Sequence, residues 1–242
     1  MEEKILELFP TVSYLTHFID ATMLRPEATE REYIQFLREA ADGGFRCAVV
    51  PLYYLPIASL ELKGSEVVPC TVIGFPFGNN SYDAKKSEAV LALQHGAREM
   101  DMLINISALR SGRYARVKEE IEAVVAMARR YDTGRGEGHI VVKVILETAY
   151  LSRSETRRGA ELAKEAGADF VKTSTGFGPS GASVEEVSFL REVVGPGFGV
   201  KASGGIGSLR DMMDMVEAGA NRIGTSRASE ILAEYLRIYP WK

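Results

Sequence analysis

The chain alternates eight times between a short apolar run, which ends in small or turn-forming residues, and a segment of helical periodicity. The eight runs are FIDATML (18–24), RCAVVP (46–51), VVPCTVIGF (67–75), REMDMLIN (98–105), HIVVKVILE (139–147), DFVKTS (169–174), FGVKAS (198–203) and NRIGTS (221–226). This alternation predicts a parallel sheet covered by helices, of the α/β class. Eight units within 242 residues favour a closed (β/α)8 TIM barrel over an open doubly wound sheet. We therefore expect a single TIM-barrel domain over residues 1–242.

The boundaries between these segments carry repeated signals. Three similar phrases place a glycine where a helix C-terminus needs a left-handed residue: HGAR (95–98), AGAD (166–169) and AGAN (218–221). Three helix starts have a serine followed three residues later by a carboxylate that complements free backbone N–H groups: Ser152 with Glu155, Ser183 with Glu186 and Ser208 with Asp211. We also expect an extra N-terminal helix before residue 18 that closes the bottom of the barrel.

Composition limits the kinds of partner. The net charge of -4 offers no basic face of the size that nucleic-acid binding requires, and no run is long enough to span a membrane. The acidic N-terminus does not read as a secretion signal, and two cysteines without a metal-type spacing indicate reduced thiols in the cytoplasm. We expect Cys47, near the end of the second strand, to be buried and unreactive. The scattered histidines and the absent H-E-x-x-H motif indicate neither a metal nor a cofactor.

Lysines interrupt three of the predicted strands, although a buried ammonium is costly unless it is paired. They are Lys143 in HIVVKVILE, Lys172 in DFVKTS and Lys201 in FGVKAS. Because side chains alternate along a strand, their apolar neighbours face the helices and the lysines face the barrel interior. Asp101 in REMDMLIN lies opposite the methionine face and points into the same interior. The sequence therefore predicts three amines and one carboxylate from four consecutive strands in one place.

This combination suggests covalent chemistry. Lys172 and Lys201 lie on neighbouring strands about 4.8 Å apart, so we expect each amine to lower the pKa of the other. A partly neutral lysine attacks carbonyl groups to form a Schiff base, and Asp101 would balance charge and move protons. The alternative is an ionic network that only stabilises the barrel. Three lysines at the C-terminal ends of strands favour catalysis, but these patterns leave open which lysine is the nucleophile.

The loops after the last three strands suggest an anion site. They read TSTGFG, SGGIGS and GTSRAS, so small residues bring backbone N–H groups close to helix N-termini. TIM barrels commonly bind a substrate phosphate there. The expected binding residues are Gly176, Ser203, Gly204, Gly205, Thr225 and Ser226, with Arg227 as a charged partner. The alternative is that the small residues only permit tight turns.

DFVKTSTGFG, VKASGGI and EMDMLIN together resemble the deoxyribose-phosphate aldolases, which are class I aldolases on a TIM barrel; the resemblance extends from residue 18 to residue 226. It implies that Lys172 is the Schiff-base lysine, that Lys201 perturbs its pKa and assists proton transfer, and that Asp101 is the acid/base carboxylate. The further substrate-binding residues that we assign on this basis are Asp20, Thr22, Lys143 and Thr173.

The resemblance implies reversible cleavage of 2-deoxy-D-ribose 5-phosphate to D-glyceraldehyde 3-phosphate and acetaldehyde, in deoxyribonucleotide catabolism. It also implies a homo-oligomer, a dimer or tetramer. Two alternatives remain: a transaldolase-like or other sugar-phosphate lyase with a different substrate, and a phosphosugar-binding barrel without catalysis. The chain departs from the family pattern at Ala21, Arg25, Val50 and Arg227, where histidine, lysine, asparagine and serine are common. These positions bear on substrate preference, not on the reaction type.

Overall fold

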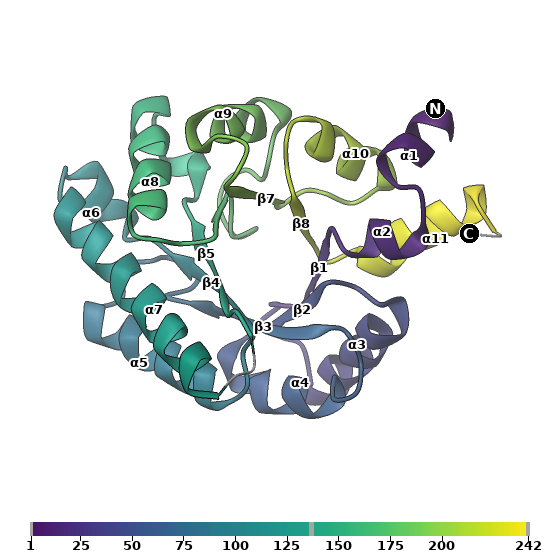
Figure 1. Cartoon of the computed structure of the whole chain (residues 1–242), viewed down its shortest axis with the longest axis horizontal. Helices are drawn as coiled ribbons and strands as arrows, with labels where there is room; N and C mark the ends of the chain where they lie inside the picture. Colours follow the sequence, from purple (N-terminus) through teal and green to yellow (C-terminus); the bar gives the residue numbers. More distant parts are fainter. Residues whose placement is uncertain (1, 136–137, 241–242) are drawn as a thin grey trace.

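The computed structural model describes residues 2–135 and 138–240. Within those ranges, eight parallel strands close into one barrel, with β8 paired to β1 (Figure 1). The strands are β1 (Ile19–Thr22), β2 (Cys47–Val50), β3 (Val68–Ile73), β4 (Glu99–Leu103), β5 (Val141–Ile145), β6 (Phe170–Lys172), β7 (Gly199–Ser203) and β8 (Arg222–Thr225). Each lies inside the run that predicted it, so the single-domain TIM barrel is confirmed.

Helices surround the strands on the outside of the barrel (Figure 1). The longer ones are α3 (Glu30–Gly43), α4 (Leu55–Glu61), α5 (Tyr82–Gln94), α7 (Tyr114–Arg135), α8 (Arg153–Glu165), α9 (Val184–Val194), α10 (Leu209–Glu217) and α11 (Ala228–Ile238). Three short elements follow β2, β4 and β5: η1 (Leu52–Tyr54), α6 (Ile106–Arg110) and η2 (Thr148–Tyr150). Among the helices of the described ranges, none has the length and apolarity that a membrane span requires.

The predicted two-faced strands explain how charges come to lie inside the barrel. On β4, Met100 and Met102 are fully buried in the main apolar core, which the strands share with the helices. Asp101 therefore points the other way, as the alternation of side chains requires. The register places Asp101 beside Lys143, and Lys172 beside Lys201. Neighbouring strands thus deliver the charged groups at nearly the same height in the barrel.

The predicted helix boundaries are confirmed at both ends. Ser152 and Ser208 form complete capping boxes with the carboxylates three residues later, whereas Ser183 accepts a hydrogen bond from the Glu186 N–H at 3.2 Å without a reciprocal bond. The predicted glycines follow α5, α8 and α10 with positive φ angles: Gly96 (92°), Gly167 (77°) and Gly219 (110°). The helices therefore end where predicted, and each strand begins within the run that predicted it.

The N-terminal prediction is wrong in part. Two short helices, α1 (Glu2–Leu8) and α2 (Val12–Thr16), precede β1 instead of one. They lie at the periphery beside α10 and α11, not across the end of the barrel (Figure 1). The Tyr235 hydroxyl donates to the Phe9 carbonyl at 2.8 Å, and the Phe9 ring meets Phe18 edge to face with centroids 5.7 Å apart. Apolar side chains of the segment are thus buried against α11, which left none to cover the barrel axis.

A buried ion pair joins two of the outer helices. Lys85 on α5 and Glu120 on α7 are 1% and 4% exposed, and their Nζ and Oε2 atoms lie 2.9 Å apart. The Lys85 ammonium also donates to the Leu103 carbonyl at the end of β4, at 3.0 Å. The pair therefore ties α5 and α7 to the strand that carries Asp101.

Substituting Glu120 by Ala should cost about 3 kcal/mol or more in the free energy of unfolding, because the buried Lys85 ammonium loses its carboxylate. Urea denaturation measures this loss. The control is Glu122→Ala on the same helix, which removes an exposed pair with Lys118 and should cost less than about 1 kcal/mol. Equal losses in the two variants would contradict the assignment.

Candidate active site

The structure brings the predicted charged cluster together around one carboxylate. Asp101 accepts hydrogen bonds from Lys143 at 2.9 Å through Oδ1, and from Lys172 and Lys201 at 2.8 Å each through Oδ2. The four side chains are at most 2% exposed. They come from four consecutive strands, β4 to β7. A single buried carboxylate is therefore shared by three amines.

A second carboxylate, Asp20 on β1, pairs with two of these amines, Lys201 and Lys143. Its Oδ2 accepts a hydrogen bond from Lys201 and lies 3.6 Å from the Lys143 Nζ. Its Oδ1 accepts a hydrogen bond from Arg222 at 2.6 Å. Asp20 is fully buried and, like Asp101, Lys172 and Lys201, is absent from the lining of the cavity above. Lys143 is also fully buried outside that lining.

The two amines that sequence analysis treated alike have opposite pKa shifts. Burial lowers the pKa of Lys172, and the nearby Lys201 ammonium lowers it further, against the opposing effect of Asp101. Burial also disfavours the charged form of Lys201, but Asp101 and Asp20 outweigh burial and raise the pKa of Lys201 above its usual value. The expectation that each lysine lowers the pKa of the other is therefore wrong for Lys201. The second carboxylate is the cause.

The other charged groups keep their charge. Burial raises the pKa of an isolated carboxyl, but the three surrounding ammonium groups outweigh burial and hold the pKa of Asp101 well below its usual range. Burial would lower the pKa of Lys143, but its carboxylate neighbours raise that pKa well above its usual value. Lys172 is therefore the amine of the cluster that is most readily neutral.

A cavity of about 630 Å³ opens at the C-terminal ends of the strands. Its lining includes the predicted residues Thr22, Gly176, Ser203, Gly204, Gly205, Thr225, Ser226 and Arg227. Gly224 connects this cavity to the charged cluster, because a Cβ there would lie only 2.9 Å from the Cε of Lys201. Gly204 has a φ of 89° and approaches Gly181 so closely that a side chain on Gly181 would meet the Gly204 carbonyl. The last three loops thus form one wall of the cavity.

Thr173 follows Lys172 and, like the predicted residues Asp20 and Lys143, is fully buried outside the cavity lining. Its hydroxyl donates to the Ser203 carbonyl at 3.2 Å and accepts from the Ser203 N–H at 3.1 Å. Thr173 therefore joins the ends of β6 and β7, and its contact with substrate stays a prediction. Thr175, two residues later, lines the cavity.

Two further features were missed by sequence analysis. Glu147, at the end of β5, has a φ of 55° and accepts hydrogen bonds from the N–H and hydroxyl groups of Thr175. The ring of Phe177 lines the cavity and meets Phe75 edge to face, with centroids 5.4 Å apart. The position of Glu147 directly after the apolar run HIVVKVIL was a signal that could have identified this glutamate. Nothing in the sequence pairs two phenylalanines from loops that are a hundred residues apart.

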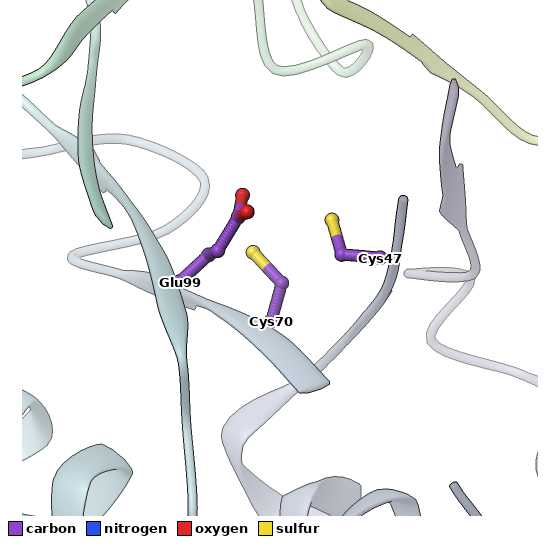
Figure 2. A group of neighbouring side chains, drawn as sticks. All are labelled: Cys47, Cys70 and Glu99. Atoms are coloured by element: carbon purple, nitrogen blue, oxygen red, sulfur yellow. The ribbon is translucent and has the colours of Figure 1, made fainter. Parts of the chain in front are cut away.

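Cys47, Cys70 and Glu99 also meet inside the barrel, with donor atoms within 4.8 Å of one another (Figure 2). The cysteine spacing did not reveal this group. Cys47 is buried as predicted but begins β2, so its predicted place near the strand end is wrong. The Lys143 Nζ lies 2.5 Å from Glu99 Oε2 and 3.7 Å from the Cys70 sulfur. Because an ammonium already supplies the counter-charge that a metal would bring, we assign no metal site here.

The comparisons with known proteins agree with this arrangement. The family model described as DeoC/LacD family aldolase matches residues 18–229. A relative from a Thermoanaerobacter species, named deoxyribose-phosphate aldolase, is 49% identical over 224 residues, which cover 93% of this chain and 98% of that protein. One from Caldanaerobacter subterraneus subsp. tengcongensis, with the same name, is 50% identical over 221 residues and covers 91% and 93%. A solved structure titled "Unique tetrameric structure of deoxyribose phosphate aldolase from Aeropyrum pernix" has a TM-score of 0.87 at 37% identity and covers 97% and 96%.

Acidification should weaken the fold through Asp101. Its folded-state pKa lies below the unfolded value of about 3.9, so its stabilising contribution is present above that pH and is lost as the pH falls through the folded pKa. We expect the free energy of unfolding to decline below about pH 4. The variant Asp101→Asn should be less stable at neutral pH and decline less steeply.

Urea denaturation between pH 7 and pH 3 measures these two slopes. Glu119→Gln serves as the control, because its exposed pair with Arg116 contributes little to stability. This control should follow the wild-type curve. Parallel curves for Asp101→Asn and the wild type below pH 4 would show that Asp101 does not carry the acid sensitivity.

Proposed function

The chain belongs to the DeoC/LacD family of aldolases, and we propose that it is a deoxyribose-phosphate aldolase. The reaction is the reversible cleavage of 2-deoxy-D-ribose 5-phosphate to D-glyceraldehyde 3-phosphate and acetaldehyde, as a class I lyase acting in deoxyribonucleotide catabolism. The observation that carries the proposal is Lys172. It is a buried amine with a lowered pKa at the C-terminal end of β6, where barrel active sites lie.

The lysine supplies the electron sink for the reaction. The neutral amine of Lys172 attacks the C1 aldehyde of the open-chain sugar, and loss of water gives an iminium ion. Removal of the proton from the C3 hydroxyl then breaks the C2–C3 bond, and the electron pair moves to the iminium nitrogen as an enamine. Glyceraldehyde 3-phosphate leaves with the new carbonyl group. Protonation of the enamine at C2 and hydrolysis of the resulting iminium release acetaldehyde and restore Lys172.

Asp101 and Lys201 are placed to move these protons. Lys172 and Lys201 contact the same oxygen, because Asp101 Oδ2 accepts a hydrogen bond from each of their ammonium groups at 2.8 Å. The raised pKa of Lys201 keeps it charged beside Lys172, so the new iminium forms next to an anchored cation and a carboxylate. Asp101 remains ionised at neutral pH and is therefore able to accept a proton.

An apolar wall favours a small donor aldehyde. Cys47, Val49, Cys70 and Val72 form a separate buried cluster on β2 and β3, and Leu24 and Phe75 pack against it. The Cys70 sulfur lies 3.7 Å from Asp101 Oδ1, so this cluster lies directly beside the charged groups. Leu24, which packs on this cluster, lines the cavity, and we propose that this apolar side accommodates the methyl group of acetaldehyde rather than the hydroxyl groups of a ketose donor. The acetaldehyde-dependent reaction is thus favoured over transaldolase-like alternatives.

The substrate phosphate would lie in the last three loops. Ser203, Gly204 and Gly205 precede α10, and Thr225 and Ser226 precede α11, so two helix N-termini with their partial positive charges adjoin the cavity. The Arg227 guanidinium lies across Gly207, where a Cβ would be only 3.2 Å from Nη1. We assign Arg227 as a further cation for the phosphate, in a position where the family often has serine.

A tetrameric relative bears on the oligomeric state of this protein, and its free cysteines bear on the cellular compartment. The Aeropyrum pernix relative is described as tetrameric, and we propose a homo-oligomer, a dimer or tetramer, for this chain. Light scattering of the purified protein would decide this. Cys47 and Cys70 are free and buried, which supports a reducing compartment such as the cytoplasm.

Treating the protein with acetaldehyde and borohydride should leave a reduced two-carbon adduct on Lys172, which peptide mapping by mass spectrometry locates. The variant Lys172→Leu should form no adduct and lose about 10⁴-fold or more in kcat, as when other catalytic nucleophiles are removed. Its far-UV circular dichroism should be unchanged, because an apolar side chain replaces a buried amine.

The location of the adduct discriminates among the alternatives. An adduct on Lys201 or Lys143 would keep the reaction class and overturn the assignment of the nucleophile. Binding of deoxyribose 5-phosphate without any adduct or turnover would instead indicate a phosphosugar-binding barrel without catalysis. A donor larger than acetaldehyde that reacts faster would indicate a different sugar-phosphate lyase.

The variant Arg227→Ser should raise the KM for 2-deoxyribose 5-phosphate by about tenfold, because one charge-assisted contact to the phosphate is lost. The value of kcat/KM for unphosphorylated 2-deoxyribose should be nearly unchanged. Arg210→Ser is the matched control, since this exposed arginine on α10 pairs with Asp214 outside the cavity lining. If both substrates respond equally to Arg227→Ser, the residue does not bind the phosphate.

A further inference from the structure

A second layer of charged side chains lies beneath the catalytic cluster. Glu99 and Arg222 are the first residues of β4 and β8, which are on opposite sides of the closed barrel. Their side chains meet across the interior, with Arg222 Nη1 3.1 Å from Glu99 Oε2, and they are 7% and 1% exposed. The guanidinium also lies 5.4 Å from the centroid of the Phe170 ring. This cross-barrel pair is absent from the reaction described above.

The pair is connected to the catalytic cluster through ion pairs. Glu99 lies 2.5 Å from the Lys143 ammonium, which in turn lies 2.9 Å from Asp101. On the other side, Arg222 binds Asp20 at 2.6 Å, and Asp20 binds Lys201. Both routes end at groups that contact Lys172 or its partner carboxylate. A change of charge on Glu99 or Arg222 is therefore felt at Lys172 through a medium with little water to screen it.

The charges of this network balance when one of its amines is neutral. Among the described residues, the ion-paired and fully buried members are three carboxylates and four cations: Asp20, Glu99 and Asp101, and Lys143, Lys172, Lys201 and Arg222. Arg46 also reaches Glu99, at 3.4 Å from the barrel end, but its side chain is 39% exposed, so water screens its charge. Glu147 is bonded to Thr175 and forms no ion pair with these groups among the described residues. Cys47 and Cys70, the titratable groups on β2 and β3, add no charge as thiols.

Lys172 is also the amine with the fewest carboxylate partners. Within residues 2–135 and 138–240, it forms one ion pair, with Asp101, whereas Lys201 forms two and Lys143 forms three. When one proton must leave the network to balance the charge, the amine held by one carboxylate releases it most easily. The directions of the pKa shifts agree, because the pKa of Lys172 is lowered and those of the other two are raised.

We propose that Glu99 and Arg222 are positioning residues whose cross-barrel ion pair sets the charge balance of the interior and thereby keeps Lys172 as its one unprotonated amine. Neither residue touches the substrate. Removing the negative charge of Glu99 makes Lys172 release its proton more easily, and removing the positive charge of Arg222 makes Lys172 retain it. The inference rests on the proposed function only in taking Lys172 as the amine that reacts.

The test measures the protonation of Lys172 without using turnover. Cyanate carbamylates neutral amines, so the rate of Lys172 carbamylation against pH, followed by peptide mapping, reports its titration. We expect Glu99→Gln to shift the profile to lower pH and Arg222→Met to shift it to higher pH, each by about one unit, as expected for a buried charge in the same interior that little water screens. The double variant restores the balance and should return the profile towards that of the wild type.

Opposite shifts are a result that a purely structural role would not produce. The control Glu120→Gln alters the buried pair with Lys85 outside the barrel and should leave the Lys172 profile unchanged. Shifts in the same direction, no shift in either variant, or wild-type Lys172 that reacts no faster than Lys201 at pH 7 would overturn the proposal. Circular dichroism confirms the fold, and should one single variant not fold, the other and the double variant still decide.

The acetaldehyde and borohydride experiment separates this inference from the proposed function. An adduct on wild-type Lys172 together with unshifted carbamylation profiles would leave the aldolase standing and overturn the role of Glu99 and Arg222. Opposite shifts without an adduct would establish the charge balance and remove the Schiff-base reaction. For an active enzyme, the acid limb of kcat/KM against pH should move in the same directions as the carbamylation profile.

Discussion

The interior of this barrel is dominated by the cost of burying charge. Asp101, which is fully buried, is stable as an anion only because three amines contact it, and those amines are stable as cations only where carboxylates are near. One carboxylate does not suffice for three amines. Asp20 provides a second carboxylate for Lys201, and Glu99 provides another for Lys143. Lys172 has no carboxylate partner other than Asp101 among the described residues. Within the described ranges, Lys172 is therefore the amine of the cluster with the fewest carboxylate partners.

Closure of the sheet makes this distribution of charge feasible. In an open sheet, β1 and β8 would lie at opposite edges, whereas here they pair, with Asp20 beside Gly224. Asp20 thus lies within reach of Lys201, and the Arg222 side chain crosses to Glu99 on the far side. The same closure gathers the loops after β6, β7 and β8 around the mouth. From bottom to top, the barrel interior holds the Glu99–Arg222 pair, the charged cluster around Asp101 and the loops that line the cavity.

The features of the site that could be predicted were those set by residues close together in the sequence. Alternation along single strands was enough to turn Asp101, Lys143, Lys172 and Lys201 inward, and a run of small residues was enough to identify the loops at the mouth. Local signals did not distinguish Thr173 from Thr175, because both lie in the phrase KTSTG and only Thr175 lines the cavity. The end of strand β6 at Lys172, and the turn that follows, separate the two threonines.

The sequence by itself determined the barrel and the inward face of each charged strand, because these depend on residue periodicity and on helix caps that act over a few residues. The resemblance of three motifs to one aldolase family determined the expected reaction. Only the tertiary structure decided that the pKa of Lys172 is lowered and that of Lys201 is raised, that Glu99 meets Arg222, and that the N-terminal helices pack beside α11. These outcomes depend on distances between groups on strands that are far apart in the chain. Electrostatic energies are set by such distances and by burial, and neither is written in the local pattern.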